Sequence, residues 1–105
     1  MAARDRSVSL VHIVLFKKRL ETAQDPVREH RLIDQLRSLD RSIDCIREWK
    51  VSANVLDRPI CWDWVLEARF DDADTLDAYL SHPSHVALLA DLMSYFECAV
   101  CDYFE

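Results

Sequence analysis

The apolar residues of this chain recur with the period of a strand in some segments and of a helix in others. Residues 9–17 are an almost unbroken apolar run rich in β-branched residues, which is typical of a strand buried on both faces. Residues 60–70 alternate apolar and polar positions, and residues 45–53 predict a partner strand across a turn at 54–59. A short strand is predicted over 99–104.

Three helices are predicted between these strands. Asp25 and Pro26 give the N-cap and first turn of a helix whose apolar residues recur at three- and four-residue spacing from Leu32 to Ile43. Acidic residues at 71–74 begin a second helix that runs through Leu80, and a third starts at residue 83 or 84.

The resulting order, β-α-β-β-α-α-β, predicts an α+β, ferredoxin-like fold with a four-stranded antiparallel sheet and helices on one face. The other face is expected to carry large apolar residues, some of the tryptophans among them. A homodimer that stacks two such sheets would bury that face. The length fits one domain, which we place at 9–105 after a flexible N-terminal lead at 1–8.

Charge and composition narrow the classes of partner. The net charge of −6 argues against nucleic acid and against an anionic membrane surface as partners. No apolar run reaches the roughly 20 residues that span a bilayer, and the polar N-terminus lacks a signal-like apolar region. We therefore expect a cytoplasmic protein with reduced cysteines. Cys98 and Cys101 have CxxC spacing, but a strand points them to opposite faces.

Candidate chemistry is concentrated in residues 77–85, where Tyr79, His82 and His85 surround Pro83. Two imidazoles and a phenol so close together suit proton transfer. The alternative is that this run only starts a helix, with a hydroxyl as the cap. His12 is an isolated polar residue in the first apolar strand, either hydrogen-bonded at the sheet face or lining a cavity.

Several segments together resemble the stress-responsive A/B barrel (Dabb) family. These are residues 12–17, 62–71, 76–79 followed by His82-Pro83-Ser84-His85, and 100–103, so the likeness runs from residue 10 to residue 104. The resemblance implies ferredoxin-like subunits that form a dimeric α/β barrel. The sequence departs from the family at Cys45 and Ser52, where glycine is frequent.

The resemblance also implies candidate site residues. One plant member of the family is a polyketide cyclase that closes a ring by aldol condensation, and its tyrosine and catalytic histidine correspond to Tyr79 and His85. A first-strand histidine corresponds to His12. Most members of the family have no assigned reaction, and a shared fold does not transfer a function.

Three hypotheses follow. In the first, a small-molecule enzyme uses His85 as general base and Tyr79 as donor to a carbonyl oxygen, without a cofactor. His12 and His82 would then support the substrate, and an apolar or aromatic ligand would lie against Trp62 or Trp64. In the second, the protein is a non-catalytic, stress-associated dimer that binds a ligand or is structural. The third, a metal site at His82 and His85, lacks a third ligand.

Overall fold

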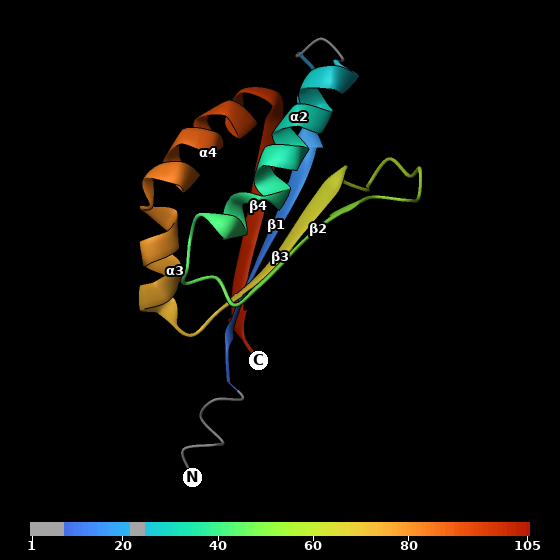
Figure 1. The fold of residues 1–105 in the computed structure, drawn as a ribbon. Helices are drawn as coiled ribbons and strands as arrows, with labels where there is room; N and C mark the ends of the chain where they lie inside the picture. The colour runs from blue at the N-terminus through green and yellow to red at the C-terminus, as the bar shows by residue number, and fades with distance from the viewer. Residues whose placement is uncertain (1–7, 22–24) are drawn as a thin grey trace.

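The computed structural model describes residues 8–21 and 25–105. The predicted lead at 1–8 lies, apart from Val8, outside the described residues. Four strands form one antiparallel sheet in the order β2-β3-β1-β4 (Figure 1). They are β1 (Leu10–Lys18), β2 (Glu48–Ala53), β3 (Trp64–Phe70) and β4 (Phe96–Phe104).

The helices pack on one face of this sheet, so that the molecule has two layers (Figure 1). They are α2 (Pro26–Arg37), α3 (Ala73–Leu80) and α4 (Pro83–Tyr95), with a 3-10 turn, η1 (Leu39–Arg41), after α2. The predicted α+β, ferredoxin-like order β-α-β-β-α-α-β is therefore confirmed. None of the described helices combines the length and the apolar content that a membrane crossing requires.

The ends of some elements differ from prediction. β3 starts at Trp64 rather than at residue 60, because its ladder with β2 begins at the pair Ala53–Trp64 and the connecting turn occupies the residues between. The last strand starts at Phe96 rather than at residue 99, because α4 runs directly into a strand that pairs from Lys18 onward. The first predicted helix ends at Arg37, short of Ile43.

The core lies between the sheet and the helices. Alternate residues of β1 and β3 point into it, and Phe16, Leu66 and Phe70 are each at most 2% exposed. They pack with Ile33 of α2 and Leu92 of α4, which are also buried. Each such side chain contributes about 1.5–3 kcal/mol when it leaves water. This packing holds the helices in place over the sheet.

The tryptophans of the strands lie on the covered face, which corrects the expectation that some occupy the open one. Trp64 shares its face with Leu66, Ala68 and Phe70, because side chains alternate along a strand. Its indole Nε1 donates to Glu29 of α2 at 2.8 Å, and the Nε1 of Trp49 donates to the Leu36 carbonyl at 2.9 Å. These polar partners on α2 allow both rings to pack against the core.

The open face of the sheet carries aliphatic residues and ion pairs instead. On β1 and β3 it presents Val11, Ile13, Leu15 and Val65. Toward the β2 edge, Lys50 pairs with Glu67 at 3.4 Å and Arg69 with Glu48 at 3.2 Å.

The turns form without glycine. No described residue has a positive φ, including Cys45 and Ser52, so none of these turns needs the left-handed region that glycine favours. Aspartates cap two helices: Asp25 accepts from the Arg28 amide at 3.1 Å, and Asp72 from the Thr75 amide at 2.9 Å.

Candidate functional site

The break between α3 and α4 positions the candidate residues. α3 ends at Leu80, and Pro83 begins α4, as the sequence predicted. His82 lies between them in an extended conformation, and its Nδ1 accepts a hydrogen bond from the Ser84 amide at 3.1 Å. The N-cap of α4 is therefore an imidazole, whereas the alternative interpretation of the sequence had a hydroxyl as the cap. This contact uses one ring nitrogen of His82 to start the helix.

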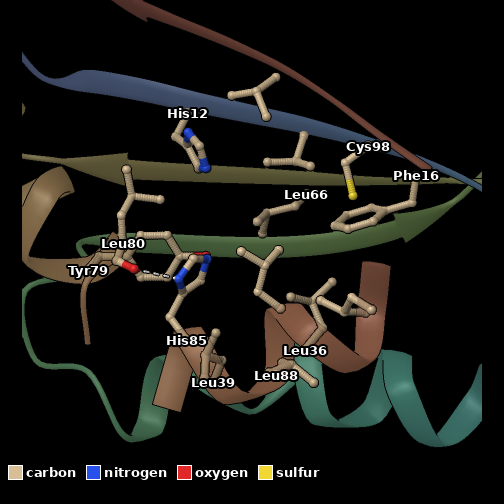
Figure 2. Close-up of a pocket in the computed structure, with 14 residues that line it drawn as sticks. His12, Phe16, Leu36, Leu39, Leu66, Tyr79, Leu80, His85, Leu88 and Cys98 are labelled. Carbon is tan, nitrogen blue, oxygen red and sulfur yellow. Dashed lines mark hydrogen bonds between the residues drawn. The ribbon is translucent and has the colours of Figure 1, made fainter. Parts of the chain in front are cut away.

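His85 reaches back from the first turn of α4 to the end of α3. Its Nδ1 is 2.8 Å from the Leu80 carbonyl oxygen (Figure 2). A carbonyl can only accept, so Nδ1 must carry the hydrogen. In the neutral ring the other nitrogen, Nε2, then holds an unshared electron pair. His85 thus has the tautomer that a general base needs.

Tyr79 lies beside His85 in the interior. It is 2% exposed, and its ring centroid is 4.4 Å from that of His85 and 5.1 Å from that of Phe70. Burial raises the pKa of the Tyr79 phenol well above its ordinary value, so the hydroxyl stays protonated at physiological pH. Within the described part of the chain, the Tyr79 hydroxyl forms no hydrogen bond with another residue. The hydroxyl is therefore able to donate to a ligand.

His12 completes this group from the sheet. It is 4% exposed, and its ring centroid is 6.0 Å from that of Tyr79. Its Nδ1 is 2.5 Å from Oδ1 of Asp102, the residue opposite it on β4. The two sequence interpretations of His12 are therefore compatible, because the ring is hydrogen-bonded at the sheet face and also lines a cavity.

Asp102 is a residue that the sequence analysis missed. On β4 it occupies the side that faces the helices, and the other positions on that side are apolar or cysteine: Phe96, Cys98, Val100 and Phe104. A carboxylate in such a series is a signal that a polar partner lies opposite. The carboxylate accepts the Nδ1 hydrogen of His12, so that a neutral His12 also has its electron pair on Nε2.

These side chains meet in a cavity of about 140 Å³ between the sheet and the helices (Figure 2). His12, Tyr79 and His85 contribute its polar groups, and its other walls are mostly aliphatic and aromatic. Those walls are Val14, Phe16, Leu36, Leu39, Leu66, Leu80, Leu88, Leu89, Leu92, Cys98 and Val100. Leu80, Leu89 and Val100 are also partly exposed, at 39%, 38% and 57%, so we place the mouth of the cavity beside them.

Three of the predicted substrate-binding residues do not line this cavity. His82 caps α4, and the Trp64 indole is hydrogen-bonded to Glu29. Trp62 lies in the turn before β3, where the Lys17 ammonium is 6.0 Å from its ring centroid. The structure thus brings together His12, Tyr79 and His85, and it leaves His82, Trp62 and Trp64 outside.

The cysteines do not form a redox pair among the described residues. Cys98 lines the cavity and Cys101 is exposed on the opposite face of β4, as the alternation predicted; both are free. Burial raises the pKa of the Cys98 thiol, so it stays protonated. Over residues 8–21 and 25–105 we find no group of three histidine, cysteine, aspartate or glutamate side chains placed to hold a metal ion.

The environment of His85 favours its neutral form. Burial lowers its pKa below the ordinary value of 6.5, and the nearby His12 and His82 lower it further. The hydrogen bond to the Leu80 carbonyl opposes this shift only in part. At neutral pH the Nε2 electron pair is therefore available inside the cavity.

Comparisons with known proteins agree with this fold. The model of the family described as Stress responsive A/B Barrel Domain matches residues 10–105. An uncharacterized protein of Streptomyces coelicolor is 35% identical over 92 residues, which are 88% of this chain and 95% of that protein.

Solved structures show the same likeness. A dimeric protein of unknown function with a ferredoxin-like fold, from Bacteroides fragilis, is 28% identical, with a TM-score of 0.74 over 90% of this chain and 94% of that one. A hydroxynitrile lyase from Passiflora edulis is 16% identical, with a TM-score of 0.79 over 92% of this chain and 93% of that one. At 16% identity, the comparison with the lyase shows only that the two chains share a fold.

The pH titration of His85 tests its environment. We expect its NMR resonances to titrate with a midpoint below 6.5, because burial disfavours the charged ring. The same chain unfolded in urea is the control, and there the midpoint should return to the ordinary histidine value. A midpoint at or above 6.5 in the folded protein would contradict the description of the site.

Proposed function

This chain belongs to the stress-responsive A/B barrel domain family. We propose, from the geometry of its cavity, that it is a small-molecule enzyme whose general base is His85. One observation carries the proposal: an imidazole with its electron pair on Nε2 lies beside a protonated phenol in an apolar cavity. A base and a hydrogen-bond donor are the two groups that enolate chemistry requires.

The proposed step is removal of a proton from carbon next to a carbonyl group. His85 Nε2 takes the proton, and the electron pair of the C–H bond moves into the carbonyl group to form an enolate. Tyr79 donates a hydrogen bond to the enolate oxygen, where charge develops. Return of the proton to a different carbon or to the opposite face gives an isomerase. Attack of the enolate carbon on a second carbonyl gives an aldol ring closure of the polyketide-cyclase type, in which the new alkoxide oxygen takes the proton from His85. The reverse reaction gives a lyase.

His12 and Asp102 support this step from the sheet. The carboxylate fixes the Nδ1 hydrogen of His12, so that Nε2 is the nitrogen left for a substrate. The cavity of about 140 Å³ favours a small substrate, since the pockets that hold drug-sized ligands have volumes of about 300–1,000 Å³. The hydroxynitrile lyase offers a precedent for small-molecule chemistry on this fold, although its sequence supports no residue-level transfer.

A non-catalytic, stress-associated ligand-binding or structural dimer is the second candidate. This candidate is supported by the structural contacts of three histidines, two at the α3–α4 break and one on β1. His82 caps α4, His85 bonds to the end of α3, and His12 bonds to Asp102. In that case the histidines would contribute to stability and ligand affinity without any turnover.

Proton exchange with solvent separates the two candidates before the natural substrate is known. The protein is incubated in D₂O at neutral pD with a panel of small aryl ketones, and loss of the α-proton signal is followed by NMR. We expect the wild type to accelerate exchange of at least one ketone over buffer. His85→Ala should remove at least about 100-fold of that acceleration, because the general base is lost.

Tyr79→Phe should also slow the exchange, since the enolate oxygen loses its donor. The control is His30→Ala, which removes an exposed imidazole from α2 and should leave the rate unchanged. If His85→Ala exchanges ketones as fast as the wild type while the fold is intact, His85 is not the base. If the wild type matches buffer for the whole panel, the non-catalytic candidate replaces the enzyme.

We also infer that this chain forms a homodimer through the open face of its sheet. The aliphatic residues Ile13, Leu15 and Val65 are incompletely buried there, and Leu15 is 37% exposed, whereas their neighbour Val11 is already buried within the subunit. A second copy would cover them by the same surface on both subunits. The Bacteroides fragilis relative, described as dimeric, supports this inference.

Native mass spectrometry tests the dimer. The wild type should be a dimer, and Ile13→Lys should be monomeric, because dimer formation would bury the new charge at the centre of the open face without a partner. Val27→Lys is the control, since Val27 is 74% exposed on α2, away from the sheet. A monomeric wild type would contradict this account of the open face.

A further inference from the structure

The loop between β2 and β3, residues 54–63, presents apolar side chains to water, and we call it the hairpin loop. Val55 and Ile60 are 89% and 84% exposed, and Leu56, between them in the chain, is exposed as well. The start of the loop is held in shape, because the Asn54 side-chain amide donates to the Leu56 carbonyl at 2.7 Å. In Figure 1 the loop extends beyond the sheet, on the side away from α3 and α4. Apolar side chains displayed in a preset conformation are typical of a contact surface.

A second exposed apolar surface surrounds the mouth of the cavity. On α4, the exposed residues Val86, Leu89 and Met93 recur at three- and four-residue spacing, so they lie on one face of the helix. Leu89 also lines the cavity, together with the exposed Leu80 of α3 and Val100 of β4. These residues together form what we call the rim. Because all of them are exposed, the rim is an apolar surface without a cover in the described part of the chain.

The hairpin loop and the rim lie at opposite edges of the sheet. The strand order β2-β3-β1-β4 puts the loop on the β2 side and Val100 on the β4 edge. Three strand spacings of about 4.8 Å separate β2 from β4, so the two edges are about 14 Å apart. The loop also extends away from α4, so it does not cover the rim of its own chain (Figure 1). A contact between the two surfaces therefore needs a second copy of the chain.

A dimer through the open face alone would have a small apolar contact. On β1 and β3, the incompletely buried aliphatic residues of that face are Ile13, Leu15 and Val65. A stable interface buries about 800 Å² and about 20–30 residues on each partner. A two-fold axis parallel to the strands would place the β2 edge of one subunit over the β4 edge of its partner. Each hairpin loop would then reach the other subunit's rim, and the contact would form twice.

We propose that the hairpin loop of one subunit packs on the rim of its partner and closes the mouth of the partner's cavity. One contact would cover both exposed apolar surfaces, whereas a contact between two loops would leave both rims exposed. Each cavity would then be complete only in the dimer, and the loop would exclude water from it. This inference rests on the homodimer of the proposed function, and it concerns access to the site rather than the reaction.

Photo-crosslinking tests the contact without any substrate. A benzophenone amino acid replaces Ile60, and this protein is mixed with ¹⁵N-labelled wild type so that mass spectrometry distinguishes links between subunits from links within one. We expect links from position 60 to residues 80–100 of the other subunit. The same amino acid at Val27, an exposed position on α2, is the control and should give no such links. Links only within one subunit, or only from loop to loop, would overturn the proposal.

The natural cysteines test the closure of the cavity. Cys98 lines the cavity, whereas Cys101 lies on the open face and reports the state of the dimer. Labelling of each thiol by N-ethylmaleimide is followed by peptide mass spectrometry. In the double variant Val55→Ser with Ile60→Ser, Cys98 should react at least about tenfold faster than in the wild type, because its access through the mouth is no longer blocked. The rate of Cys101 should stay unchanged, since the dimer persists.

Val27→Ser is the control and should leave the rates of both thiols unchanged, because Val27 lies on α2, away from the mouth. A dimeric loop variant in which Cys98 reacts as slowly as in the wild type would overturn the closure. If the double variant dissociates, which faster labelling of Cys101 would reveal, the links from position 60 decide the question.

The outcomes separate this proposal from the proposed function. Links between loop and rim without ketone exchange would support the contact and contradict the enzyme. Ketone exchange by a dimer without such links would support the enzyme and overturn the contact. A monomeric wild type would overturn both the dimer and the contact, whatever the result for ketone exchange.

Discussion

The hydrogen bond between His85 and the Leu80 carbonyl is the contact on which the arrangement of the cavity depends. The last carbonyls of a helix have no partner within it, and Pro83 prevents α3 from continuing. His85, in the first turn of α4, supplies a donor to one of these carbonyls. The same bond fixes which ring nitrogen carries the hydrogen. The hydrogen bond that gives the Leu80 carbonyl a partner thus also leaves the electron pair of the neutral His85 ring on Nε2, where a general base needs it.

The cavity has a cost for a domain of this size. A closed void of the same volume, about 140 Å³, would reduce stability by on the order of 3 kcal/mol, at about 24 cal/mol per Å³, and this is an upper bound for a cavity that has a mouth. His12 and Tyr79 beside it take up buried positions that aliphatic residues would fill more favourably, and His85 lies half-buried next to them. Such local departures from good packing are expected where function requires them, and here they coincide in one place.

Much of the fold was predictable because it depends on local periodicity. The alternation at 60–70 and the proline at 83 determined a strand and a helix start that the structure confirms, apart from their exact ends. The cluster from Tyr79 to His85 was also visible, since its members are neighbours in the sequence. What local patterns could not determine was which sheet face the helices cover, and so some of the tryptophans were expected on the open face.

Long-range pairing explains the remaining differences. His12 and Asp102 are 90 positions apart and meet only because β1 and β4 pair in one register. The far end of the cavity, Phe16 and Cys98, depends on the same register. The capping role of His82 depended on the geometry of a single ring, which residue type alone does not specify.

The most direct test of this account is the tautomer of each histidine, measured by long-range ¹H–¹⁵N NMR on the neutral rings. The structure predicts that His85 and His12 carry their hydrogen on Nδ1, and that His82, whose Nδ1 accepts from Ser84, carries it on Nε2. His82 is thus an internal control with the opposite tautomer. A hydrogen on Nε2 of His85 would place a donor in the cavity and contradict its role as base.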